Sequence, residues 1–222
     1  MYSILLSKME IGFPIVEKRL KKIIKKNSKV IIIPWSFPNE TDKIGLNEYY
    51  DKKIKPKYEK ILIDFGIDKK NIKHLNCYNK NIKMMKKYIN ESDVLILPGG
   101  NPEMFFSKIV HETELLYVIK HYKKIIIGVS AGACLHFKRY FITAKNNYYN
   151  YFAFYDGFGI LNNSFLIDVH SSNNKLYFNK LRNISKEYMK DVYAIYNDGA
   201  IIVNRKNNNI EMFGNVLKID NK

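Results

Sequence analysis

The amino-acid sequence predicts an α/β fold with a mainly parallel central sheet. Short apolar runs rich in isoleucine, leucine and valine alternate with longer segments of helical periodicity. Two of these runs, residues 93–97 and 124–127, lead directly into glycine-containing turns. Alternating strands and helices favour right-handed βαβ units around a parallel sheet. No internal repeat and no linker rich in Pro, Gly and Ser divides the 222 residues, so we expect one domain over residues 1–222.

The first half of the chain supplies four of the expected strands. They are short apolar runs at residues 3–6, 30–34, 72–75 and 93–97. Helical spacing lies between them, and in the first helix Val16, Leu20 and Ile24 fall on one face. The helices of this half are expected at residues 15–26, at residues 40–65 with a break near Pro56, and at residues 80–89.

The second half begins with a helix and becomes richer in strands. A helix is expected at residues 103–120, and a strand at 124–127 leads into a turn at Ser130 followed by a short helix. The remaining elements are strands at 164–170, 192–196, 200–203 and 211–219, and a helix at 175–190. Sheets of this kind place their sites at the carboxyl ends of the strands.

The charge of +16 raises the possibility of a nucleic-acid partner. However, only four of the 37 basic residues are arginines, the residue that makes bidentate contacts to bases and phosphates. The lysines are scattered, and the cluster at residues 18–26 is expected to be the solvated face of a helix. We therefore expect no specific nucleic-acid partner.

The sequence contains no apolar run long enough to cross a bilayer and no signal-peptide pattern, so we expect a soluble, cytoplasmic protein without a membrane partner. Two cysteines, Cys77 and Cys134, form neither a metal-ligand pattern nor a disulfide framework, which fits a reducing compartment.

The stretch GVSAGA at residues 128–133 is the strongest candidate for a catalytic turn. Ser130 follows an apolar strand and opens a helix, so a sharp turn would expose its hydroxyl. The flanking glycines relieve crowding, and free N–H groups at the helix start, beginning with that of Ala131, would face a developing oxyanion. The alternative is a purely structural strand-to-helix turn.

A second glycine loop follows the neighbouring expected strand. Gly99 and Gly100 would allow backbone N–H groups to approach a substrate and supply a further oxyanion donor. Asn101 and Pro102 are equally typical of a helix N-cap and first helical position. Both interpretations can hold together.

A serine nucleophile also needs a base, and His170 is the best placed of the five histidines because it ends an expected strand. An exposed strand-end residue is the equal alternative. His74 is expected to be exposed, His111 and His121 to be solvated, and His136 to pack or lie at the surface.

The carboxylate that would orient the base has several candidates: Asp156, Asp168, Asp191 and Asp198. Asp198 lies at an expected strand end. However, the segment Asn197–Asp198–Gly199 is also typical of a hairpin turn, and the residues alone favour the turn.

Together these segments resemble the serine peptidase family of peptidase E (aspartyl dipeptidase) and cyanophycinase. The order and spacing match over roughly residues 90–205. Five segments carry the resemblance: residues 97–101 (LPGGN), 128–133 (GVSAGA), 156–161 (DGFGIL), 168–170 (DVH) and 197–200 (NDGA). The family implies a flavodoxin-like three-layer sandwich, similar to class I glutamine amidotransferases.

The resemblance also implies roles for individual residues. Ser130 would be the nucleophile and His170 the general base. Asp198 would be the third triad member, at a position where the aspartyl dipeptidase has the longer glutamate. The N–H groups of Gly100 and Ala131 would form the oxyanion hole, with Gly99 and Asn101 in the same substrate-binding loop.

The implied function is a cytoplasmic serine exopeptidase, monomeric or homodimeric, that hydrolyses short peptides through an acyl-enzyme without metal or organic cofactor. An N-terminal aspartate is the expected preference, with Lys175 or Arg182 as its cation. Two alternatives stay open: a cyanophycinase-like or isoaspartyl peptide hydrolase, and a non-catalytic binding protein of the same fold.

Overall fold

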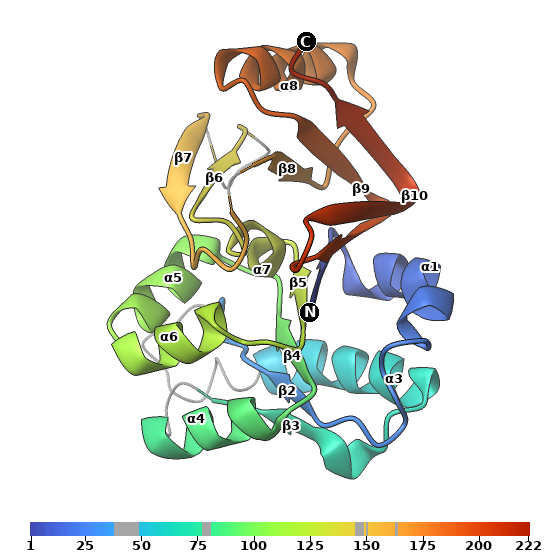
Figure 1. Cartoon of the computed structure of the whole chain (residues 1–222), viewed down its shortest axis with the longest axis vertical. Helices are drawn as coiled ribbons and strands as arrows, with labels where there is room; N and C mark the ends of the chain where they lie inside the picture. The colour runs from blue at the N-terminus through green and yellow to red at the C-terminus, as the bar shows by residue number, and fades with distance from the viewer. Residues whose placement is uncertain (38–48, 77–80, 145–148, 150, 163) are drawn as a thin grey trace.

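The computed structural model describes residues 1–37, 49–76, 81–144, 149, 151–162 and 164–222 (Figure 1). In these residues a mostly parallel sheet runs in the order β10-β9-β1-β5-β4-β2-β3, and β8 also pairs with β9. Only the pairs β1–β9 and β9–β10 of this sheet are antiparallel. The strands are β1 (Tyr2–Leu6), β2 (Val30–Ile32), β3 (Ile72–His74), β4 (Val94–Leu97), β5 (Ile125–Val129), β8 (Leu166–Val169), β9 (Val192–Asn204) and β10 (Asn209–Ile219).

Helices cover both faces of the sheet, which gives three layers as predicted (Figure 1). Successive strand residues point to opposite faces, so Leu95 and Leu97 of β4 join one apolar cluster and Val94 and Ile96 join the other. The first cluster packs against α4 (Ile82–Glu91), α5 (Pro102–Val110), α6 (Thr113–Lys120) and α7 (Ala131–Cys134). The second packs against α1 (Met9–Leu20) and α3 (Lys55–Phe65).

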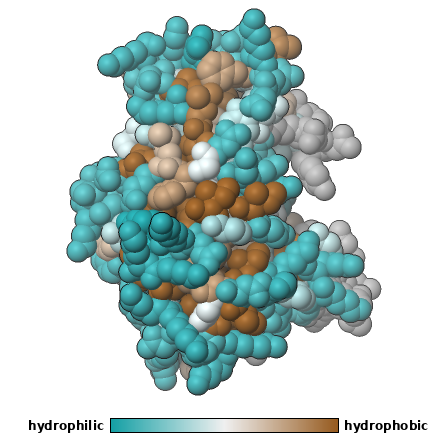
Figure 2. Space-filling model, turned by 90° about the vertical axis from the view of Figure 1, so that its right-hand side faces the viewer, coloured by the Kyte–Doolittle hydropathy of each residue, from teal (hydrophilic) through white to brown (hydrophobic). Residues whose placement is uncertain are grey.

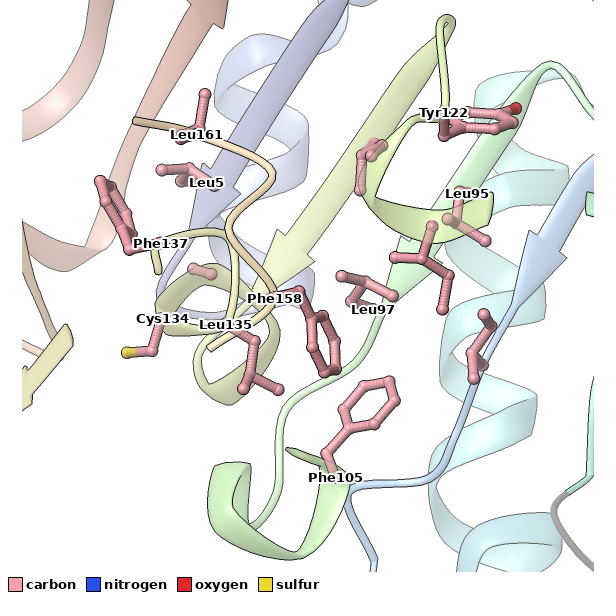
Figure 3. Packing of buried hydrophobic residues seen from close by; sticks show 14 of the residues in the cluster. Leu5, Leu95, Leu97, Phe105, Tyr122, Cys134, Leu135, Phe137, Phe158 and Leu161 are labelled. Atoms are coloured by element: carbon pink, nitrogen blue, oxygen red, sulfur yellow. The ribbon is translucent and has the colours of Figure 1, made fainter. Parts of the chain in front are cut away.

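The short helix α7 lies within the first cluster and packs directly against the end of β4 (Figure 3). A Cβ atom on Gly132 would lie 1.9 Å from the carbonyl oxygen of Leu97. Only glycine therefore allows this contact. The aromatic rings of Phe105 on α5 and Phe158 meet edge to face beside α7, at 5.4 Å between centroids.

A smaller cluster holds the C-terminal part of the chain together. It joins Phe141 of β6 (Arg139–Ile142) to Leu181 and Ile184 of α8 (Lys175–Glu187), and to β8, β9 and β10. Strand β6 pairs with β7 (Ala153–Asp156) as a separate two-stranded sheet beside β8. The sequence indicated a β-rich region here, but we predicted neither strand.

Two predicted helices have different bounds. Helix α1 starts at Met9, before the predicted residue 15, and includes Pro14, because Met9 and Phe13 extend the buried face that continues to Leu20. It ends at Leu20, before the predicted residue 26. The predicted helix 103–120 is two helices, α5 and α6, because its buried residues Ile109 and Leu115 are six apart and do not share one helical face.

The predicted helix 40–65 lies partly outside the described residues. Its described part comprises a π-helical turn, Tyr50–Ile54, that passes into α3 at Lys55, next to the predicted break at Pro56. A short 3₁₀ turn, Lys69–Asn71, then precedes β3. The helix type therefore changes from π to α next to the predicted break at Pro56.

The surface is mostly hydrophilic on the face shown in Figure 2, with apolar patches between the hydrophilic regions. The lysines at the end of α1 and after it are exposed, as expected of a solvated cluster: Lys18, Lys21, Lys22, Lys25 and Lys26. In the described residues no helix is both long and apolar enough to cross a membrane.

Candidate active site

The candidate residues meet at the carboxyl edge of the sheet. Ser130 directly follows β5 and His170 directly follows β8. Gly99 and Gly100 come two and three residues after the end of β4. A Cβ atom on Gly99 would lie 3.3 Å from Cβ of Ser130, so this loop touches the serine. The strand-end rule therefore brings these four residues together.

Ser130 sits on a strained turn. Its φ of 50° lies in the left-handed region, which costs a non-glycine residue on the order of 1–3 kcal/mol. Its N–H donates to the carbonyl of Leu6 at 2.8 Å, and its own carbonyl accepts from Ala133 and Cys134. These bonds hold the strained backbone between β1 and α7.

The imidazole of His170 connects Ser130 to β9. Its Nε2 lies 2.8 Å from Oγ of Ser130, and its Nδ1 lies 2.7 Å from Oδ1 of Asn197. An amide oxygen only accepts hydrogen bonds, so Nδ1 carries the proton in the neutral ring. Nε2 is then free to accept the hydroxyl proton of Ser130, which is the arrangement a general base requires.

The structure places Asn197, and not the predicted Asp198, against Nδ1 of His170. The two residues lie within β9, which runs unbroken through the predicted hairpin turn. Neighbouring strand residues point to opposite faces, so only one of them can face the imidazole. Asp198 is exposed.

The predicted hairpin at Asn197–Asp198–Gly199 is therefore wrong. Strand β9 pairs with β8 through Ile195 and with β1 through Ala200, so these three residues bridge the two partners. Gly199 also faces β10 closely, because a Cβ atom there would lie 2.1 Å from the carbonyl of Asn215.

Ser7 supports this junction, and no pattern in the sequence predicted its role. Its buried hydroxyl donates to the carbonyl of Ile195 at 2.7 Å and accepts from the N–H of His170 at 3.0 Å. His170 itself has a φ of 54°, so its backbone needs such support. The contact joins residues 163 positions apart, which no local pattern reveals.

Two backbone donors lie beside Ser130. Ala131 is the first residue of α7, where an N–H has no partner within the helix. In the described part of the chain neither this N–H nor that of Gly100 has a hydrogen-bond partner. Asn101 caps α5 instead, because its Oδ1 accepts from the N–H of Met104 at 2.9 Å.

Two of the other candidate carboxylates, Asp168 and Asp191, have partners of their own. Asp168 is buried and accepts from the hydroxyls of Ser171 and Tyr177, each at 2.6 Å. Asp191 pairs with Lys218 at 2.9 Å. Asp156 is the exposed last residue of β7. Asp168 thus ties the segment after His170 to α8.

Three further histidines lie where the sequence predicted, one in the interior and two at the surface. His136 is fully buried and pairs with the carbonyl of Gly132 at 2.7 Å, so it packs as predicted. Burial lowers the pKa of His136 to about 3, which keeps it neutral at physiological pH. His111 and His121 are exposed, as expected.

His74 differs from its prediction, because it is partly buried and bonded. Its ring lies 2.6 Å from the hydroxyl of Tyr50 and 3.2 Å from a carboxylate oxygen of Glu59. Burial lowers the pKa of His74. The cause of the difference is the π-helical turn at Tyr50, which covers the end of β3 and which we did not predict.

A cavity of about 520 Å³ is lined by α5, β6 and β7. Half of its lining side chains are aromatic, and the others are acidic or basic. The lining residues are Glu103, Phe106, Arg139, Phe154, Tyr155 and Asp156. Lys175 and Arg182, the predicted cations for an acidic substrate, are exposed on α8.

The described residues contain no group of three or more histidines, cysteines and carboxylates able to hold a metal ion. Cys134 is a buried cysteine, and Cys77 lies outside the described residues.

Comparison with known proteins decides the family. A model of peptidase family S51 matches residues 4–210. The chain belongs to peptidase family S51. This confirms the resemblance drawn from the sequence and identifies this S51 protein as a peptidase hydrolase. A search of curated proteins finds no match.

Solved structures share the fold of this S51 peptidase. A candidate peptidase E protein from Listeria monocytogenes EGD-e aligns with a TM-score of 0.61 and 17% identity, over 96% of this chain and 98% of that one. A peptidase from an acI-B1 Actinobacterium aligns with a TM-score of 0.67 and 13% identity, over 100% and 91%. At these identities the likeness establishes the mostly parallel, helix-flanked α/β fold, consistent with the flavodoxin-like prediction.

Proposed function

We propose that the chain is a serine peptidase that hydrolyses short peptides, with Ser130 as nucleophile, His170 as general base and Asn197 as the residue that orients the base. The observation that carries the proposal is the contact of 2.8 Å between Nε2 of His170 and Oγ of Ser130. Membership of peptidase family S51 supports it independently.

Acylation would begin when Oγ of Ser130 attacks the scissile carbonyl carbon and its proton passes to Nε2 of His170. The carbonyl oxygen becomes an oxyanion that the N–H groups of Gly100 and Ala131 stabilise. His170 then gives its proton to the amide nitrogen as the C–N bond breaks. The amine leaves, and the acyl group remains on Ser130.

Deacylation would repeat these steps with water. His170 takes a proton from the water as its oxygen attacks the ester carbon, and returns that proton to Oγ of Ser130 as the ester bond breaks. The carboxylic acid leaves and the neutral enzyme is restored. Ser130 and His170 account for each proton transfer.

Asn197 sets a limit on this chemistry. Its amide holds His170 in the tautomer whose Nε2 carries no proton, as a carboxylate would. It carries no charge, however, so it stabilises the imidazolium formed during acylation less than the usual aspartate or glutamate does. We therefore propose that His170 is an active general base, but a weaker one than a histidine oriented by a carboxylate.

The proposed partner is a short peptide, acted on in the cytoplasm, where thiols such as that of Cys134 stay reduced. An N-terminal aspartate is the proposed preference, by likeness to the aspartyl dipeptidase. The enzyme is proposed to work as a monomer or homodimer.

The test is hydrolysis of a dipeptide panel by the parent protein and by Ser130→Ala. The panel carries acidic, basic and neutral N-terminal residues, and includes β-linked aspartyl peptides. We expect the parent to cleave at least one class and Ser130→Ala to lose about 10³-fold or more of that activity. Equal cleavage by both proteins would contradict the proposal, and cleavage of β-linked peptides alone would assign an isoaspartyl hydrolase.

A further inference from the structure

Ser36 lies beside the glycine loop at the candidate active site, four residues after the end of β2. Its side chain is fully buried. Its hydroxyl donates a hydrogen bond to the carbonyl of Gly99. Its own carbonyl accepts from the N–H of Asn101 at 2.7 Å. Ser36 therefore holds the loop on both sides of Gly100.

The bond to Gly99 sets the direction of the next N–H group. The carbonyl of Gly99 and the N–H of Gly100 belong to one peptide unit, and the described chain has no cis peptide bond. In a trans peptide these two groups point in opposite directions. Because the carbonyl points at Ser36, the N–H of Gly100 points away from Ser36.

A peptide between two glycines turns over more easily than any other, because no Cβ atom on either side resists rotation. Gly100 has a φ of +126°, and a Cβ atom there would lie 2.6 Å from the carbonyl oxygen of Ser36. The site thus requires glycine and cannot gain rigidity from a larger residue. A hydrogen bond from outside the loop has to supply that rigidity.

We propose that Ser36 is a positioning residue that locks the Gly99–Gly100 peptide so that the N–H of Gly100 faces the oxyanion formed at Ser130. The inference rests on the proposed function, in which that N–H is an oxyanion donor. Without the hydroxyl, the peptide turns over and presents the carbonyl of Gly99 to the oxyanion. The residue acts on the transition state and leaves ground-state binding unchanged.

The test uses a fluorophosphonate probe on the full chain and follows the rate of adduct formation at Ser130 by mass spectrometry. Ser36→Ala is expected to lower the maximal rate about 10- to 100-fold, with the half-saturating probe concentration unchanged. Ser36→Thr, which keeps the hydroxyl, is expected to recover most of the rate. Ser28→Ala is the matched control, because Ser28 is also buried but lies before the opposite end of β2.

The outcomes separate this inference from the proposed function. A parent protein that forms no adduct at Ser130 overturns both. A parent that reacts while Ser36→Ala reacts at the same rate, or no more slowly than Ser28→Ala, overturns the role of Ser36 alone. Thermal unfolding of each variant shows whether a slower rate reflects lost fold, and Ser36→Cys, with its weak S–H donor, carries the test if Ser36→Ala does not fold.

Discussion

Replacing Asn197 with alanine should lower kcat/KM for peptide hydrolysis about 10²- to 10⁴-fold, whereas Asp198→Ala should stay within about threefold of the parent. Asn197 holds Nδ1 of His170 at 2.7 Å, and without it the ring is free to rotate or to adopt the other tautomer. Asp198 is exposed and makes no such contact among the described hydrogen bonds. Steady-state kinetics of the two variants, with the best substrate of the dipeptide panel, measure the difference.

A third variant, Asn197→Asp, separates orientation from a merely structural role. Aspartate has nearly the same shape and can accept the same proton, but its charge favours the protonated imidazole. The acidic limb of the pH–rate profile should therefore move to higher pH, with activity retained on the alkaline side. A larger loss in Asp198→Ala than in Asn197→Ala would show that the predicted aspartate, and not Asn197, is the third member.

Gly132→Ala should be the most destabilising single-methyl change near the site, at about 3 kcal/mol or more. The new Cβ atom would lie 1.9 Å from the carbonyl oxygen of Leu97, so α7 has to move away from β4. Alanine is the better helix former by about 1 kcal/mol, but this gain is smaller than the cost of the overlap. Urea unfolding gives the free energy of unfolding of parent and variant.

Gly66→Ala is the control for this change. Gly66 has a φ of +110°, and no atom lies within 4 Å of the place where its Cβ would be. Its cost is therefore conformational alone, on the order of 1–2 kcal/mol. A loss for Gly132→Ala no greater than that for Gly66→Ala would contradict the close packing of α7 on β4.

The alternation of strands and helices was enough to predict the mostly parallel sheet, and the strand-end rule made Ser130, His170 and the glycine loop candidates for one site. An exposed strand-end residue was the equal alternative for His170, and its contact with Ser130 is a finding of the structure. The predicted features depend on local patterns, since apolar periodicity marks each element and a parallel sheet brings its carboxyl ends together. The same rule did not identify the partner of His170. Which of Asn197 and Asp198 faces the imidazole depends on the phase of β9, and pairing with two different strands sets that phase.

Ser7 and Ser36 were beyond sequence reasoning for a different reason. Serine has no distinctive pattern, and each of these residues acts through contacts to segments far along the chain. His74 was predicted to be exposed, and the prediction was wrong because an unforeseen π-helical turn covers it. Tertiary contacts, and not local preference, decided all three positions.

The pairing of Ser130 with His170 is tested most directly by locating a fluorophosphonate adduct by mass spectrometry in the parent protein and in His170→Ala. The structure predicts an adduct on Ser130 of the parent and formation at least about 100-fold slower in His170→Ala. An adduct that forms equally fast without His170, or a parent whose Ser130 stays unmodified, would contradict an activated serine at this site.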